Sequence, residues 1–227
     1  MDIPSYLLGK KAGGGSSPSG GDGTDWSVIG YDKEPVVVTD SINYAKNIRD
    51  NWVVKTSYQS RFSENSTMVF MPLVDTSQCT NFKNMFYKCS KLLSIPQLDT
   101  SKGTDFTSFL FVCENLISID SLDMSSATTI YNLFGNSGSP NLKYLGGFKN
   151  LGKSYSTAKS SNSTDYGLYL SFAKKLTHDS LMNIINGLYD IADKGCNTQQ
   201  LNIGSTNMAK LTEDEIAIAI EKGWTVS

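Results

Sequence analysis

The sequence predicts an α/β solenoid in which a short strand-and-helix unit stacks on copies of itself. The tripeptide Asp75-Thr76-Ser77 recurs as Asp99-Thr100-Ser101 and, with one substitution, as Asp123-Met124-Ser125, which gives a period of 24 residues. Apolar positions keep this period over residues 68–148, and a longer repeat of 35 residues follows in the C-terminal part. A fixed period of this size is typical of repeat architectures, in which each unit buries its apolar face against its neighbours.

Two spacings within each unit predict its local structure. Leu92-x-x-Ile95-x-x-Leu98 has the rhythm of a leucine-rich repeat and predicts a short extended segment. The next stretch, Phe106-x-x-Phe109-Leu110, has the i, i+3, i+4 spacing of a helix face. The expected core columns are Met68/Leu92/Leu116, Met71/Ile95/Ile119, Val74/Leu98/Leu122, Phe82/Phe106/Ile130, Met85/Phe109/Leu133 and Phe86/Leu110/Phe134.

The aspartates of the repeated tripeptide lie between the two halves of the unit. We expect each carboxylate to accept hydrogen bonds from nearby backbone N–H groups in a turn, with a metal or substrate ladder as the alternative.

The register of the 24-residue repeat breaks once, after Phe134, where two extra residues precede Leu142. Such an insertion predicts a surface loop, either an ordinary one or one on a binding face.

Each copy of the 35-residue repeat predicts a strand, a linker and a helix. The threonines of Leu176-Thr177 and Leu211-Thr212 are the expected N-caps, and Glu215 completes a capping box with Thr212. The second helix should stop at Gly223, and Trp224 should cover the last unit. The predicted buried faces are Leu181, Ile184, Ile185 and Leu188 in the first helix, and Ile216, Ala219 and Ile220 in the second.

An amphipathic helix is expected ahead of the first repeat, capped by Asp40 and with Ile42, Ala45, Ile48 and Trp52 on its apolar face. It would cover the open N-terminal edge of the stack. Upstream, the Gly/Ser-rich composition predicts a tether, and the apolar residues before it suggest a docking peptide, with a disordered tail as the alternative. The expected organisation is a leader or docking peptide (1–11), a flexible linker (12–24), an N-terminal cap with a helix (25–67), 24-residue repeats (68–151) and C-terminal strand–helix repeats (152–227).

Composition argues against several classes of partner. The net charge is −2, with both signs mixed, so nothing favours nucleic acid. No apolar run approaches the length of a membrane span. The start lacks the basic and apolar regions of a signal peptide. We therefore expect a protein that stays in the cytoplasm or leaves it in a particle released by lysis.

The sequence predicts no catalytic, cofactor-binding or metal-binding residue. The only histidine, His178, is expected to be exposed at the start of a helix. Cys89 and Cys113 share one column, as buried thiols or as a disulfide, and no cysteine pair has zinc-site spacing. Two converging carboxylates for glycoside hydrolysis stay open as an alternative. Tyr87, Tyr131 and Tyr144 are exposed aromatic candidates for contacts, but the binding residues stay unassigned.

The pattern Phe86-Tyr87-x-Cys89-Ser90-x-Leu92-x-Ser94-Ile95-Pro96-x-Leu98-Asp99-Thr100-Ser101 resembles the BspA-like leucine-rich-repeat surface proteins of gut bacteria and their phages. The resemblance covers about residues 52–227, and the first residues are similar to short leaders of phage virion and tail-associated proteins. It implies a horseshoe-like leucine-rich-repeat solenoid used for adhesion or receptor binding, without a catalytic set.

Together these features predict a non-enzymatic binding or adhesion module on a phage virion or tail, assembled in the host cytoplasm. Residues 1–11 would dock on another protein of the particle, and the repeats would bind a bacterial surface protein or glycan. The alternatives are a glycan-degrading enzyme on a repeat scaffold and an adhesin on the bacterial cell surface. A purely structural component of the particle is a further alternative.

Overall fold

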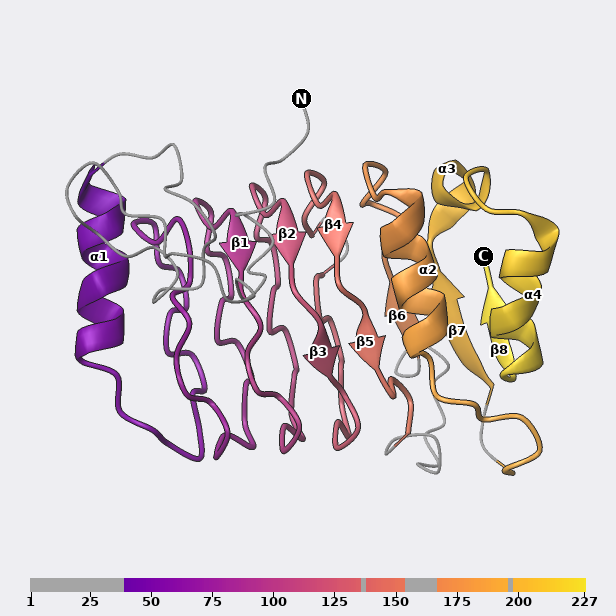
Figure 1. Cartoon of the computed structure of the whole chain (residues 1–227), viewed down its shortest axis with the longest axis horizontal. Coiled ribbons are helices and arrows are strands. Elements are labelled where there is room, and N and C mark those ends of the chain that lie inside the picture. The colour runs from indigo at the N-terminus through magenta and orange to yellow at the C-terminus, as the bar shows by residue number, and fades with distance from the viewer. Residues whose placement is uncertain (1–38, 136–137, 154–166, 196–197) are drawn as a thin grey trace, which may run out of the picture.

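The computed structural model describes residues 39–135, 138–153, 167–195 and 198–227. The expected leader and linker, together with Cys196, lie outside these ranges. The helices in the described ranges are α1 (Thr39–Asp50), α2 (His178–Gly187), α3 (Gly204–Met208) and α4 (Glu213–Glu221). Figure 1 shows the repeated units side by side along the long axis, with α1 at one end and α4 at the other.

The strands form three small parallel sheets. The first has the order β1-β2-β4 and consists of Ser94–Ile95, Ser118–Ile119 and Tyr144–Leu145. The second pairs β3 (Leu122–Asp123) with β5 (Phe148–Lys149). The third has the order β6-β7-β8 and consists of Gly167–Tyr169, Gln199–Asn202 and Trp224–Val226.

Strand pairing follows the period seen in the sequence. Ser94 pairs with Ser118, which lies 24 positions further on, and Asn81, Asp105 and Thr129 form parallel bridges at the same interval. Ser118 pairs with Tyr144, an interval of 26, so the two inserted residues are absorbed without loss of register. Successive units therefore place equivalent residues over one another.

The predicted horseshoe-like leucine-rich-repeat solenoid is wrong: the described residues form a mixed α/β fold of small parallel sheets with four helices. The expected helix around Phe106 is absent. Asn84, Lys88, Ser108 and Val112 have φ between 53° and 55°, a left-handed conformation that ends a helical turn. The N–H groups of residues 82, 84, 86 and 88 donate to carbonyl oxygens of the next unit at residues 105, 107, 109 and 111. The i, i+3, i+4 spacing thus arises from two successive turns.

The 24-residue register also extends upstream of the predicted repeats. Ser57 bridges Asn81, and the N–H groups of Tyr58, Ser60, Phe62 and Glu64 donate to the carbonyls of residues 81, 83, 85 and 87. Tyr58 and Phe62 are buried, and Phe62 stacks on Phe86 with ring centroids 5.7 Å apart. Residues 57–64 therefore form half a unit. Ahead of it, α1 buries Ala45 and Ile48; Asp40 belongs to the first turn of α1 and is not its N-cap.

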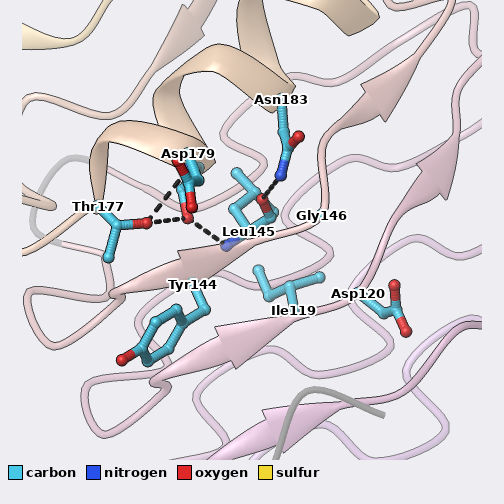
Figure 2. A pocket seen from close by; sticks show the side chains of 9 residues that line it. Ile119, Asp120, Tyr144, Leu145, Gly146, Thr177, Asp179 and Asn183 are labelled. Carbon is cyan, nitrogen blue, oxygen red and sulfur yellow. Dashed lines mark hydrogen bonds between the residues drawn. The ribbon is translucent and has the colours of Figure 1, made fainter. Parts of the chain in front are cut away.

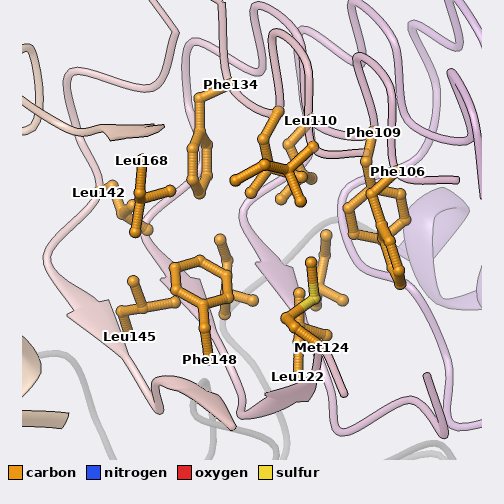
Figure 3. Close-up of a cluster of buried hydrophobic side chains, with 14 of the residues drawn as sticks. Phe106, Phe109, Leu110, Leu122, Met124, Phe134, Leu142, Leu145, Phe148 and Leu168 are labelled. Atoms are coloured by element: carbon orange, nitrogen blue, oxygen red, sulfur yellow. The ribbon is translucent and has the colours of Figure 1, made fainter. Parts of the chain in front are cut away.

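Large apolar side chains fill the space inside the units, as Figure 3 shows for Phe106, Phe109, Phe134 and Phe148. The Phe82 and Phe106 rings stack with centroids 5.1 Å apart, and Leu92, Leu116 and Leu142 are fully buried. Cys89 and Cys113 are free thiols that donate to the carbonyls of Phe62 and Phe86, each at 3.0 Å. Burial raises the pKa of Cys89 to about 12 and raises that of Cys113 as well, so neither forms a thiolate at neutral pH.

The aspartate column is structural, as predicted. Asp75, Asp99 and Asp123 each accept the backbone N–H of the serine two residues later, at 2.9, 3.1 and 3.0 Å. Asp123 also forms an ion pair with Lys149 at 2.8 Å. Although burial raises the pKa of Asp123, the hydrogen bonds from Lys149 and Ser125 outweigh it, so the net shift is downward. These carboxylates fix turns between units.

The two predicted C-terminal helices, α2 and α4, begin where the sequence predicts, and the short α3 lies between them without having been predicted. Thr177 caps α2 by accepting the N–H of Ser180, and Thr212 and Glu215 form the capping box of α4. The strands keep a different interval from the predicted 35, because Leu168 pairs with Leu201. Trp224 is buried and donates to the carbonyl of Tyr189 at 2.9 Å.

The predicted buried face of α4 is only partly correct. Ala219 is buried and Gly223 adopts φ 85° after the last turn, but Ile220 is 57% exposed. In place of a wider apolar contact, Lys222 reaches from the end of α4 to the last turn of α2. Its ammonium donates to the carbonyls of Ile185 and Asn186, both at 2.9 Å, where the negative end of the helix dipole favours a cation.

Candidate functional site

Helix α2 lies against the edge of β4 and takes the place that a further strand would occupy (Figure 2). Ser180 Oγ accepts the N–H of Leu145 at 3.0 Å and donates to the carbonyl of Lys143 at 3.2 Å. Asn183 Nδ2 donates to the carbonyl of Leu145 at 3.2 Å. Polar side chains of the helix thus satisfy the strand edge, which would otherwise be open to pairing with another chain.

The seam between the helix and the strand is hollowed on its outer side. A hollow of about 290 Å³ lies beside Tyr144, Gly146 and Asn183, and Asp120 and Asp179 face it from the strand side and from the helix. A second hollow of about 240 Å³ continues toward the end of α2. Gly146 and Asn183 line both hollows. We therefore treat the two hollows as one groove and call it the α2 groove.

The far half of the α2 groove is polar. Its lining consists of Ser121, Gly146, Gly147, Phe148, Lys149, Asn150, Asn183, Asn186, Gly187 and Leu188. The glycines let α2 and β5 pack closely: a Cβ on Gly187 would lie 2.6 Å from the carbonyl oxygen of Phe148, and one on Gly147 would lie 2.7 Å from that of Asn183. These close contacts fix how α2 meets β5.

The chemistry offered by the groove is hydrogen bonding beside an aromatic ring. Asn183 and Asn186 supply amide donors and acceptors, Asp120 and Asp179 supply acceptors, and Tyr144 supplies a ring together with a hydroxyl. Lys143 places its ammonium 4.9 Å from the centroid of the Tyr144 ring. This combination suits a ligand with many hydroxyl groups and some apolar surface, since each needs a matching partner.

His178 opens α2 next to the groove and is exposed, as predicted. Its Nε2 lies 2.8 Å from Glu215 Oε1, and its Nδ1 lies 3.7 Å from Asp179 Oδ1. The hydrogen bond to Glu215 raises the pKa of the imidazole. The pKa of Glu215 is lowered, first by the N–H of Thr212 and then by His178. This pair joins the start of α2 to the start of α4.

We expect the imidazole of His178 to titrate above the ordinary value of about 6.5. Because the folded pKa is the higher one, the stabilisation by the imidazolium is complete below about pH 6.5 and is lost as the pH rises through the folded pKa. NMR titration measures this directly, since the chain has one histidine. Glu215→Gln keeps the capping box and should lower the pKa; an unchanged titration in that variant would contradict the pairing.

Of the three tyrosines considered from the sequence, only Tyr144 lines the groove. Tyr87 stacks on Phe111 with centroids 5.0 Å apart, and Tyr131 is 50% exposed away from these hollows. Sequence reasoning missed the other residues of the groove. One available signal was the spacing of Asp179, Asn183 and Asn186, which puts three polar side chains on one face of a helix.

Neither a metal centre nor a membrane-spanning element is found in the described part of the chain. No three histidine, cysteine, aspartate or glutamate side chains converge there as metal ligands. None of the helices within residues 39–135, 138–153, 167–195 and 198–227 has the length and hydrophobicity required to cross a bilayer. Comparison with family models, curated proteins and solved structures gives no match for this chain.

Proposed function

We propose that this protein is a non-enzymatic binding module that recognises a glycan of the bacterial surface through the α2 groove, and that it is carried on a phage virion or tail. The observation that carries the proposal is the groove itself, in which Tyr144 lies among the polar side chains of Asp120, Asp179 and Asn183. Sugars present hydroxyl groups at their edges and apolar C–H groups on their faces. Amide and carboxylate groups complement the first, and an aromatic ring complements the second.

Hydrogen bonds and apolar packing beneath the groove hold its side chains in place, which favours binding without rearrangement. Leu145 is held through its N–H and its carbonyl by Ser180 and Asn183, and the buried Ile184 and Ile185 pack α2 onto the core. A site whose side chains are already held in place loses less conformational entropy when a ligand binds. A rigid scaffold with a polar groove therefore fits the role of a recognition module.

The first test is binding of the full chain to fragments of host cell wall, measured by isothermal titration calorimetry. Tyr144→Ala should weaken binding about tenfold, equivalent to about 1.4 kcal/mol, because it removes the aromatic surface of the groove. Tyr131→Ala is the matched control, since Tyr131 is exposed elsewhere, and should leave the affinity unchanged. Equal affinities for wild type and Tyr144→Ala would rule out the groove as the site.

A glycan-degrading enzyme is the competing function, because Asp120 and Asp179 line the same hollow. Such an enzyme would cut the glycan and release reducing ends. The binding module should release none from the same wall fragments over hours, and Asp120→Asn and Asp179→Asn should alter affinity only. Release of reducing sugar that disappears in either variant would establish the enzyme instead.

The proposed setting on a virion has its own test. Mass spectrometry of purified particles of the encoding phage should detect this chain among the structural proteins. Its consistent absence from particles, with detection on the bacterial envelope, would favour the adhesin of the cell surface.

A further inference from the structure

A third hollow, lined by several lysines, adjoins the α2 groove. It measures about 700 Å³, and Lys143, Lys174, Lys175, His178 and Lys210 surround it, with Leu176 and Thr177 between them. We call these five residues the cationic cluster. The whole chain has a net charge of −2, so the cluster is a local concentration of positive charge. Thr177 lines both this hollow and the groove, so the two adjoin at the start of α2.

Two of these ammonium groups, those of Lys175 and Lys210, have neutral partners. Lys210 Nζ donates to the carbonyls of Lys174 and Leu176 at 2.8 and 2.7 Å and to Asn207 Oδ1 at 2.7 Å. Lys175 Nζ donates to Asn141 Oδ1 at 2.6 Å. Within the described residues, no carboxylate forms an ion pair with Lys174, Lys175 or Lys210. The exposed ammonium groups of Lys174 and Lys175 are therefore available to an anion, whereas all three N–H donors of Lys210 are already used within the fold.

The neighbouring carboxylates do not cancel the positive charge of these lysines. Glu215 and Asp179 face His178 and offset the imidazolium, but they are not paired with the three lysines. The hollow also lies at the N-terminal end of the ten-residue helix α2, whose dipole adds a partial positive charge there. The cluster therefore presents an attractive field to a negatively charged group beside Thr177.

The two ends of the combined surface differ in charge, and this difference restricts the ligand. Asp120 and Asp179 line the groove, so a polymer with uniform negative charge, such as a nucleic acid, would bring phosphates against carboxylates. A neutral sugar portion fits the groove, and an anionic substituent fits the cluster. Lysines act as point charges toward phosphate, whose several oxygens accept from more than one ammonium group.

We infer that the cationic cluster binds a phosphate group carried by the glycan whose sugars occupy the α2 groove, so that the ligand class is a phosphate-bearing surface glycan. This inference rests on the proposed function for the sugar portion. The placement of the phosphate depends on the cluster alone, which allows the two to be tested separately.

The test uses the full chain and two wall-glycan preparations, one phosphate-bearing and the same one after its phosphate esters have been removed. Wild type should bind the phosphate-bearing fragments about tenfold more tightly, and the advantage should shrink as salt is raised, because ionic strength screens exposed charges. The Lys174→Gln/Lys175→Gln double variant should lose this advantage and keep its affinity for the dephosphorylated fragments. Equal affinity of wild type for both preparations would overturn the inference.

A matched control removes the same number of charges elsewhere. Lys55 and Lys91 are exposed and lie outside both hollows, so Lys55→Gln/Lys91→Gln should keep the full preference for phosphate. If this control loses the preference to the same extent, the attraction is a non-specific effect of net charge and the assignment is wrong.

A second arm separates failure of the inference from failure of the proposed function. In an NMR titration with inorganic tripolyphosphate, amide shifts should be confined to residues 174–178 and their neighbours around the hollow, and the double variant should abolish them. Such shifts without any binding of dephosphorylated glycan would retain the phosphate site and reject the glycan groove. The absence of shifts at these residues would overturn the phosphate site, whatever the groove binds.

Discussion

Phe106→Ala should lower the free energy of unfolding by about 3–5 kcal/mol, the usual cost of truncating a buried phenylalanine. Its ring is fully buried, stacks on Phe82 at 5.1 Å and meets Phe109 edge-on at 5.7 Å. It also lies against Gly103, where an added Cβ would be 2.4 Å from the ring. Truncation therefore removes contacts with the preceding unit and within its own unit, and leaves a cavity there.

Urea unfolding followed by circular dichroism measures this loss. The midpoint should fall while the slope of the free energy against urea concentration stays the same, which shows that stability rather than cooperativity changed. Tyr131→Ala is the control, because half of that side chain is exposed, and it should change stability by less than about 0.5 kcal/mol. A loss below about 1 kcal/mol in Phe106→Ala would show that the aromatic column is not tightly packed.

The sequence predicted the interval between units because that interval is set by side chains repeated at fixed positions. Asp99 and Ser101 specify a turn through local hydrogen bonds, and Thr177 and Thr212 specify helix starts in the same way. Such signals are local, so they can be recognised without knowing the fold. The buried columns of Leu92 and Leu116 follow from the same repetition.

The helices predicted within the units failed because one apolar spacing fits two backbone conformations. Phe106, Phe109 and Leu110 are buried as predicted, but Ser108 and Val112 adopt left-handed φ values of 53° and 55°. Asn84, the equivalent of Ser108 in the preceding unit, tolerates this conformation, whereas the branched side chain of Val112 disfavours it. Tertiary hydrogen bonding between units overrides the local preference, and a single unit does not reveal that bonding.

The candidate site was predictable only in part, for a related reason. The polar stripe of α2 follows from its helical spacing, and Tyr144 was noticed as an aromatic residue. Their meeting depends on the way α2 replaces a strand beside β4, with Leu151 bridging Leu188 and Gly187 packed on the backbone of Phe148. That arrangement is a property of the assembled sheet edge, so no repeat or motif encodes it locally.

Ser180→Ala should lower the free energy of unfolding by about 1–3 kcal/mol, because it leaves the N–H of Leu145 without its partner at a buried position. The serine hydroxyl is the link between α2 and the strand, accepting from Leu145 and donating to Lys143. Amide hydrogen exchange at Leu145 should accelerate in the variant, and binding of wall glycan should weaken as α2 loosens from the groove. Ser205→Ala, at an exposed serine of α3, is the matched control and should change none of these three measurements. If Leu145 stays protected and stability matches that of the control, the serine does not cap the strand edge, and the groove must owe its shape to the apolar packing of Ile184 and Ile185 alone.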